Sequence, residues 1–199
     1  MSDADVVIIE SGGANLASLH HALLRLGARS RVSADPAVIA AAPRLLLPGV
    51  GAAADAMSRL RGHGLADLIR TLRQPLLGIC LGMQLLYEHS EEGDTPGLGL
   101  LAGEVRRIPP APGRPVPHMG WNTCRPLQGD PLFNGIGAAD YFYFVHSYAA
   151  AVTDCCRASV DYGEAWCAVA RRDNYCGVQF HPERSGRAGA RLLRNFLES

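Results

Sequence analysis

The amino-acid sequence predicts an α/β fold with a mixed, mostly parallel central sheet, flanking helices and an additional antiparallel sheet region. In the first half of the chain, short and wholly apolar runs such as 6–9 and 76–79 alternate with amphipathic segments. That alternation is typical of strands that are buried on both faces and connected by helices, which make a parallel sheet. In the second half, strand-like runs follow one another at hairpin spacing, which favours antiparallel pairing. The chain has 199 residues, without a repeat or a low-complexity linker, so we expect residues 1–199 to form one domain.

The first half reads as strands and helices in alternation. The loop after the first strand has neither of the glycine patterns that cradle nucleotide phosphates, so no nucleotide site is predicted. Asn15, at the end of that loop, suits the N-cap of the first helix. In order, the expected elements are a strand at 6–9, a helix over about 16–26 ended by Gly27, a weak strand at 31–32, a strand at 44–47, helices to about 61 and over 65–72, a strand that ends at Cys80, and a helix over 83–87.

The second half begins with a stretch rich in glycine and proline, 92–117, which contains one short strand near 100–106. Several strand-like runs follow, and the turn residues at 172–174 indicate a hairpin between two of them. A closing helix is expected over 186–197. The expected strands of this half are 141–148, 158–161, 165–170 and 176–180.

Composition excludes several classes of function. The formal net charge is zero, and the 19 basic residues are all arginine and form no basic stripe, so no nucleic-acid partner is expected. Because the sequence has no lysine, Schiff-base chemistry and a phosphate-loop lysine are excluded. No apolar run reaches the length of a membrane span, and the first strand starts too early to leave room for a signal peptide. The six cysteines lack zinc-like spacing, so we expect no metal site and reduced thiols in the cytoplasm.

Cys80 is the strongest candidate for a catalytic residue. It ends an apolar run, with Gly78 two residues before it and Gly82 two residues after it, and a helix is expected next. A sharp strand-to-helix turn exposes a nucleophile, and glycines let neighbouring backbone approach it, as in the Gly-x-Ser-x-Gly elbow of serine hydrolases. The N–H groups and the positive dipole end of the helix start favour a thiolate. The alternative is that Cys80 is simply a small buried apolar residue.

His181 and Glu183 are the candidate base and the group that orients it. His181 ends the apolar run 177–180 and precedes Pro182, which favours extended backbone at the histidine. Residues two apart in an extended segment project to the same side, so the carboxylate can accept from one imidazole nitrogen and leave the other for sulfur. A carboxylate there also favours the imidazolium form. The alternative is a surface pair at the end of a strand.

A thiolate acyl-transfer enzyme also needs backbone N–H donors for the oxyanion. One candidate is the amide of Leu81, which directly follows the cysteine. The other is the segment 48–51 at the end of a neighbouring parallel strand, where two glycines allow close approach to a substrate. A Pro-Gly turn without catalytic meaning is the alternative for this segment.

Three segments, in the same order along the chain, make the sequence resemble the class I, triad-type glutamine amidotransferases: 47–51, 78–84 and 178–183. The resemblance implies that Cys80 is the nucleophile, His181 the base and Glu183 the residue that orients it, with no metal or organic cofactor. It also implies an oxyanion hole and contacts to L-glutamine. The residues implied are Val50, Gly51 and Leu81 for the oxyanion, and Gly51, Gln84 and Ser147 for the substrate.

Two further segments, 117–122 and 143–148, narrow the resemblance to the glutaminase subunits of imidazole glycerol phosphate synthases, and 13–16 and 183–186 agree. This implies a heterodimer with a cyclase partner, whose (β/α)8 barrel receives the ammonia for histidine biosynthesis. A glutaminase of another synthase and a stand-alone cysteine hydrolase are the alternatives. The residues implied at the partner interface are Asn15, His118, Trp121 and Asn122. For a lone histidine such as His118, a structural role is the alternative.

Overall fold

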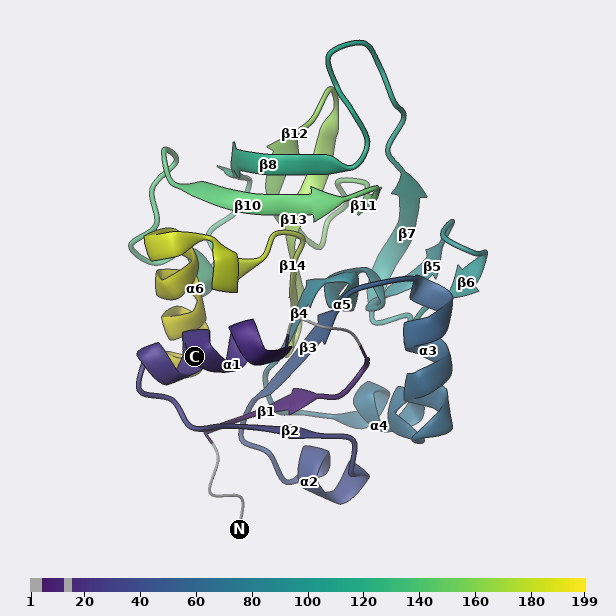
Figure 1. The fold of residues 1–199 in the computed structure, drawn as a ribbon, viewed down its shortest axis with the longest axis vertical. Coiled ribbons are helices and arrows are strands. Elements are labelled where there is room, and N and C mark those ends of the chain that lie inside the picture. The colour runs from purple at the N-terminus through teal and green to yellow at the C-terminus, as the bar shows by residue number, and fades with distance from the viewer. Residues whose placement is uncertain (1–4, 13–15) are drawn as a thin grey trace.

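The computed structural model describes residues 5–12 and 16–199, and its largest element is an eight-stranded sheet. The strands of this sheet are β1 (Val6–Ile9), β2 (Ser30–Ser33), β3 (Leu45–Gly49), β4 (Leu76–Cys80), β9 (Arg125–Pro126), β12 (Cys156–Asp161), β13 (Ala165–Arg172) and β14 (Tyr175–Val178). Their order is β2-β1-β3-β4-β14-β13-β12-β9 (Figure 1). The first five in this order are parallel, and the last three join by antiparallel pairing. The mixed, mostly parallel sheet is therefore confirmed.

Helices cover both faces of this sheet, as expected. Figure 1 shows α1 and α6 on one side of it and α3 and α4 on the other. The α-helices are α1 (Leu16–Arg25), α2 (Pro36–Ala40), α3 (Ala53–Gly62), α4 (Leu65–Thr71), α5 (Leu81–Gln84) and α6 (Gly186–Glu198), and the 3-10 helices are η1 (Pro131–Phe133) and η2 (Pro182–Arg184). In the part of the chain that the structure describes, no helix combines the length and the apolar character that crossing a bilayer needs.

The apolar core has two layers, one on each face of the main sheet. Successive residues of a strand point to opposite faces. In β1, Val6 and Ile8 pack in the layer that holds α1 and α6, whereas Val7 and Ile9 pack in the layer that holds α2, α3 and α4. All four side chains are fully buried. At roughly 1.5–3 kcal/mol for each such side chain, this double burial explains why the strand is apolar at every position.

Two smaller sheets make up the additional antiparallel region. One has four strands in the order β11 (Tyr148–Ala150), β7 (Leu101–Arg107), β5 (Tyr87–Ser90) and β6 (Thr95–Pro96), and in it β5 and β7 alone are parallel. The other has two strands, β8 (His118–Thr123) and β10 (Tyr141–His146). The single run expected over 141–148 is thus two strands of different sheets, which separate at Ser147.

Residues 85–87 are not helical, which corrects the helix expected over 83–87. α5 is a single turn, and β5 already begins at Tyr87. The backbone oxygens of residues 85–87 accept hydrogen bonds of 2.8–3.0 Å from the amides of residues 98–101, so long-range pairing replaces the local helix. Gly97 permits this approach, because a Cβ there would lie 2.1 Å from the Tyr87 oxygen.

Several short elements have no counterpart among those expected: α2, β5, β6, β8, β9, η1 and η2. α2 carries ordinary start signals, since the Asp35 carboxylate accepts from the Ala37 amide at 2.8 Å and Pro36 is its first residue. Its five residues are too few to show a helical period. β8 contains Gly120 and alternates buried and exposed residues without a β-branched run, so its pattern is weak.

Candidate active site

Cys80 lies at the end of β4, where the chain turns directly into α5. Its backbone has φ 53° and ψ −112°, a conformation that L-residues rarely adopt. The turn depends on its glycines, because a Cβ at Gly82 would lie 1.7 Å from the Leu47 oxygen and one at Gly78 would lie 2.7 Å from the Gly82 oxygen. The expected strand-to-helix elbow is therefore present, with Cys80 at its bend.

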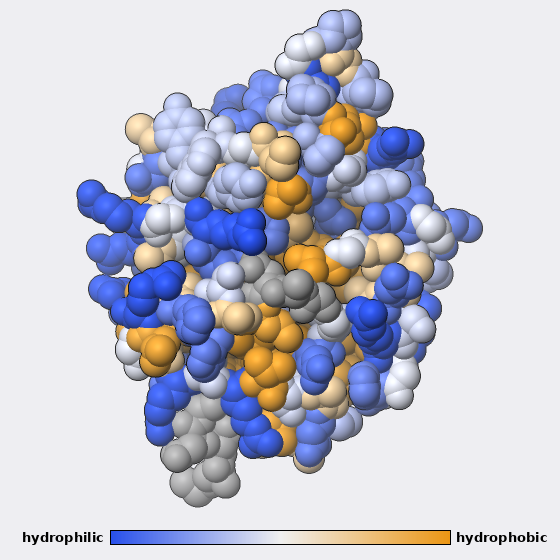
Figure 2. All heavy atoms as spheres, viewed as in Figure 1, coloured by the Kyte–Doolittle hydropathy of each residue, from blue (hydrophilic) through white to orange (hydrophobic). Residues whose placement is uncertain are grey.

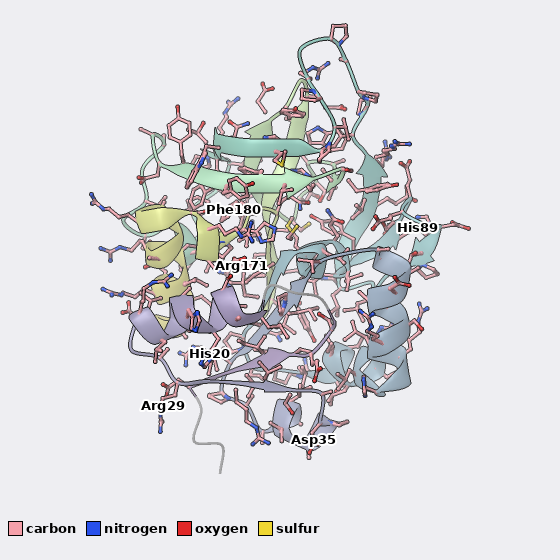
Figure 3. All side chains as sticks on the ribbon, viewed as in Figure 1. His20, Arg29, Asp35, His89, Arg171 and Phe180 are labelled. Carbon is pink, nitrogen blue, oxygen red and sulfur yellow. The ribbon has the colours of Figure 1, made fainter. Side chains whose placement is uncertain are left out.

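His181 and Glu183 form a buried ion pair just beyond β14. The His181 Nδ1 lies 2.9 Å from the Glu183 Oε1, and the two side chains are 6% and 2% exposed. His181 has the extended backbone that the following proline predicts, whereas Glu183 lies in η2 and not in an extended segment. The backbone amide of His181 donates to the Tyr143 oxygen at 2.9 Å, which fixes the histidine against β10. Phe180, labelled in Figure 3, lies beneath β10 next to it.

The charges around His181 hold a proton on its ring. Burial alone would lower the pKa of His181, but the hydrogen bonds and charges of Cys80 and Glu183 outweigh it and raise the pKa to about 10. Near neutral pH the ring is therefore an imidazolium between the Cys80 sulfur and the Glu183 carboxylate. This arrangement favours a thiolate–imidazolium pair, which is the reactive form of a nucleophilic cysteine.

The segment after β3 lies beside the elbow. Gly49 and Cys80 are paired in the parallel register of β3 and β4. Gly51 has a φ of +95°, which a residue with a side chain would rarely adopt. The Ser11 hydroxyl donates to the Pro48 oxygen and ties the loop after β1 to this segment.

A cavity of about 430 Å³ opens at the elbow, within the size range of small-molecule sites. The structure thereby brings Cys80 and His181 together with every oxyanion and substrate candidate. Glu183 is behind His181 and does not line the cavity. The lining residues are Gly49, Val50, Gly51, Cys80, Leu81, Gln84, Glu92, Val145, His146, Ser147, Tyr148, His181 and Arg184.

Some lining residues have no signal in the sequence. Glu92 lies twelve residues after Cys80 in a polar stretch with other carboxylates, and only the folded chain brings it to the cavity. Its Oε2 accepts from the Ala53 amide at 2.9 Å, at the start of α3. Arg184 and Tyr148 are likewise recognised as lining residues only in the structure.

Residues 7–199 match the family model described as "Glutamine amidotransferase class-I". The chain belongs to this family. The amidotransferase is 52% identical to the imidazole glycerol phosphate synthase subunit HisH of Xylella fastidiosa (strain Temecula1) and 55% identical to the protein of that name from Xanthomonas euvesicatoria. Each alignment spans 194 residues, 98% of this chain and 97% of the relative.

Solved structures agree with the amidotransferase fold. A crystal structure of a glutamine amidotransferase superposes with a TM-score of 0.75 at 23% identity and covers 97% of each chain. Another glutamine amidotransferase, from Thermotoga maritima, superposes with a TM-score of 0.65 at 15% identity, over 97% of this chain and 82% of its own. At these identities the likeness concerns the fold.

The surface of the amidotransferase has an apolar area on the outer side of β8 and β10. On the face in Figure 2, hydrophobic side chains show as small groups among hydrophilic ones. Met119, Trp121 and Tyr141 are 66%, 56% and 55% exposed, and all three lie on these two strands. The Trp121 ring meets the Tyr143 ring edge-on at 5.8 Å. Exposed aromatic and apolar residues gathered on one sheet are typical of a protein–protein contact.

The other residues implied at a partner interface differ in exposure. Asn122 is half-buried, and its Nδ2 donates to the Asp161 oxygen at 2.9 Å. His118 is buried, with its ring stacked between Phe144 and Tyr162, so its side chain offers little surface for direct contact with a partner. On β8 its side chain points inward, away from the exposed Trp121. Asn15 lies outside the described residues.

Proposed function

We propose that this chain is the glutaminase subunit of an imidazole glycerol phosphate synthase. It hydrolyses L-glutamine and passes the ammonia to a cyclase subunit. The observation that carries the proposal is the buried His181–Glu183 pair beside Cys80 at one cavity. The choice among amidotransferases rests on identities of 52% and 55% over nearly the whole chain to relatives of that name.

The reaction begins at the sulfur. The Cys80 thiolate attacks the side-chain amide carbon of glutamine, a C–S bond forms, and the carbonyl electrons move to oxygen. The backbone amides of Leu81 and of the Val50–Gly51 segment are the donors that we assign to this oxyanion. His181 gives its proton to the amide nitrogen as the C–N bond breaks, which releases ammonia and leaves a γ-glutamyl thioester.

Water completes the cycle. His181, now neutral, takes a proton from a water molecule whose oxygen attacks the thioester carbon. The C–S bond then breaks, which releases glutamate and regenerates the Cys80 thiolate. Throughout, Glu183 accepts from the Nδ1 of His181 and so keeps the other ring nitrogen toward the reacting atoms.

Substrate recognition follows from the cavity lining. L-glutamine carries an α-ammonium, an α-carboxylate and the reacting amide. Glu92 is a carboxylate in this cavity, and we assign it to the ammonium. Gly51, Gln84 and the backbone at Ser147 are assigned to the rest of the substrate, in line with their place around the elbow.

The partner is proposed to be a cyclase with a (β/α)8 barrel, which binds the outer side of β8 and β10. Direct transfer is needed because free ammonia in neutral water is mostly protonated and is then no nucleophile. Trp121 and Met119 are exposed apolar anchors for this contact. The six cysteines are free thiols, which suits the reducing cytoplasm, the compartment that we propose.

Glutamine hydrolysis tests the proposal. Glutamate release is measured with the purified chain alone, and then with the cyclase and its nucleotide substrate. We expect release to rise when both are added and to vanish in Cys80→Ala, while added ammonia still drives the cyclase. If the cyclase leaves hydrolysis unchanged, a glutaminase of another synthase is the better assignment. Activity on peptides or esters without any partner would instead indicate a stand-alone cysteine hydrolase.

A further inference from the structure

The backbone oxygen of Tyr148 accepts two side-chain hydrogen bonds beside the cavity. One comes from the Gln84 Nε2 and one from the His146 Nδ1, each at 2.8 Å. A carbonyl can only accept, so both side-chain nitrogens must be donors. This fixes the orientation of the Gln84 amide and places the His146 proton on Nδ1. When neutral, His146 therefore has a bare Nε2, which can only accept.

The first arm of hydrogen bonds runs from this carbonyl to β8. The His118 Nδ1 lies 3.2 Å from the His146 Nε2 and must donate to it. The His118 Nε2 is then the acceptor, and the Asn122 Nδ2 lies 3.5 Å from it. Both rings are buried, and burial lowers the pKa of His118 to about 4 and of His146 to about 3, so they are neutral near pH 7.

The second arm runs from the same carbonyl to the sulfur. The Gln84 Nε2 also donates to the Gln179 Oε1 at 3.0 Å. With its oxygen used in this way, the Gln179 amide presents its Nε2 to the Cys80 Sγ, at 3.8 Å. Gln179 is fully buried, so no water competes for its amide. An N–H donor to sulfur stabilises the thiolate over the thiol.

The two arms form one set of hydrogen bonds, which we call the Tyr148 network. Its members are Asn122, His118, His146, Tyr148, Gln84, Gln179 and Cys80. Only one combination of amide orientations and histidine tautomers satisfies every contact. The network thus connects the inner side of β8 to the Cys80 sulfur. The side chains that take part between these two ends, from His118 to Gln179, are all buried.

We propose that His118, His146 and Gln179 are positioning residues, which hold a hydrogen bond on the Cys80 sulfur and make it depend on where β8 lies. The proposal rests on the proposed function of Cys80 as nucleophile. On β8, Met119 and Trp121 point outward while His118 and Asn122 point inward. A protein bound to the outer side of β8 therefore changes or fixes the position of this strand, and with it the positions of His118 and Asn122 in the network. This gives buried His118 a role at the interface that direct contact cannot.

The reactivity of the sulfur tests the network without glutamine or a partner. The rate of Cys80 carbamidomethylation by iodoacetamide is measured at neutral pH by mass spectrometry of the Cys80 peptide. His118→Phe keeps a ring between Phe144 and Tyr162 but removes the donor, and we expect the rate to fall about fivefold, the effect of one hydrogen bond. His118→Asn, which restores a donor near the Nδ1 position, recovers most of the rate. Tyr162→Phe is the matched control, because it removes only a hydrogen bond to the Pro115 oxygen, and its rate equals that of wild type.

Gln179→Met tests the other end of the network, and we expect it to slow Cys80 by a similar factor of about five. Its kcat falls by a larger factor than its KM rises, since Gln179 does not line the cavity and Gln84 keeps its other hydrogen bond, to the Tyr148 oxygen. Wild-type rates in both His118→Phe and Gln179→Met would overturn the proposal. So would a His118→Asn variant as slow as His118→Phe, because packing would then explain the effect.

Nitrogen NMR of the unmodified protein gives an independent test if a variant fails to fold. Both His118 and His146 must be neutral and protonated on Nδ1 at neutral pH, and a proton on the His146 Nε2 overturns the network. These readouts also separate the two proposals. If glutamine is not hydrolysed with the cyclase but the alkylation and tautomer results hold, the proposed function fails and the network stands.

Discussion

Replacing Glu183 by glutamine separates the charge of the triad candidate from its shape. The side chain keeps its size, so the packing around it is preserved, but the carboxylate that accepts from the His181 Nδ1 is lost. The contact is 2.9 Å long and the Glu183 side chain is 2% exposed, so water cannot take its place. Glu183→Gln therefore changes the charge beside His181 and leaves the lining of the cavity unchanged.

The size of the effect follows from this contact. The glutamine oxygen can still accept from Nδ1, so the variant loses the charge and not the whole contact. A hydrogen bond to a charged group contributes about 1.5–3 kcal/mol and a neutral one about 0.5–1.5 kcal/mol, and about 1.4 kcal/mol corresponds to a factor of ten in rate. We expect kcat for glutamine hydrolysis to fall roughly 10-fold, with KM nearly unchanged. Because Glu183 is one of the groups that raise the pKa of His181, the alkaline limb of the kcat profile moves to lower pH in the variant. The assay is glutamate release with the cyclase present, from neutral pH to above pH 10.

Glu164→Gln provides the matched control, since Glu164 is exposed and the substitution is chemically the same. Its kcat and pH profile equal those of wild type. If Glu183→Gln also keeps the wild-type kcat and an unmoved alkaline limb, then Glu183 does not orient His181 and the reasoning is refuted.

Three further predictions concern the partner surface, stability and acid sensitivity. Trp121→Ala weakens binding of the cyclase by about 2 kcal/mol, roughly 30-fold in Kd by titration calorimetry, and unchanged affinity would place the contact elsewhere. Arg171→Met removes the cation that contacts the buried Asp130 carboxylate at 2.6 and 2.9 Å, and lowers the free energy of unfolding in urea by about 3–5 kcal/mol; a loss below about 1 kcal/mol would contradict this. His118 and His146 have pKa values lowered by burial from 6.5, so their contribution to stability is present above pH 6.5 and is lost as the pH falls toward 4. His118→Phe therefore shows a smaller decrease in unfolding free energy over that pH range, and an equal decrease would count against a neutral buried His118.

The parts of the fold that could be predicted are those in which local sequence and burial agree. β1 and β4 are apolar because both faces of the sheet are covered, and their position in the chain follows at once. β8 and the end of the helix after Cys80 could not be predicted, because distant pairing decides them. The oxygens of residues 85–87 bond to residues 98–101, and β8 exists by pairing with β10, which lies well beyond it in the chain.

The candidate site divides in the same way. Cys80, His181 and Gly51 carry signals in the sequence, because their neighbours indicate a particular backbone conformation. Glycines lie two residues to either side of Cys80, a proline follows His181, and Gly51 is one of two glycines in the segment 48–51. Glu92 and Gln179 carry none, because their contacts to the site depend on how separate segments meet. His118 shows the limit most clearly, since a motif marks it but cannot tell the inner side of a strand from the outer side.

The backbone conformation of Cys80 lowers the stability of the fold, although it exposes the sulfur to the cavity. A non-glycine residue in such a conformation costs about 1–3 kcal/mol, whereas glycine adopts it freely and loses only about 0.5–1 kcal/mol in chain entropy. We therefore expect Cys80→Gly to unfold at a temperature a few degrees higher than wild type in calorimetry, although it has no sulfur to react; a lower temperature would show that the elbow is not strained. Selection for folding stability alone would favour glycine at position 80. The presence of Cys80 in spite of this cost supports the catalytic role that we propose for its sulfur.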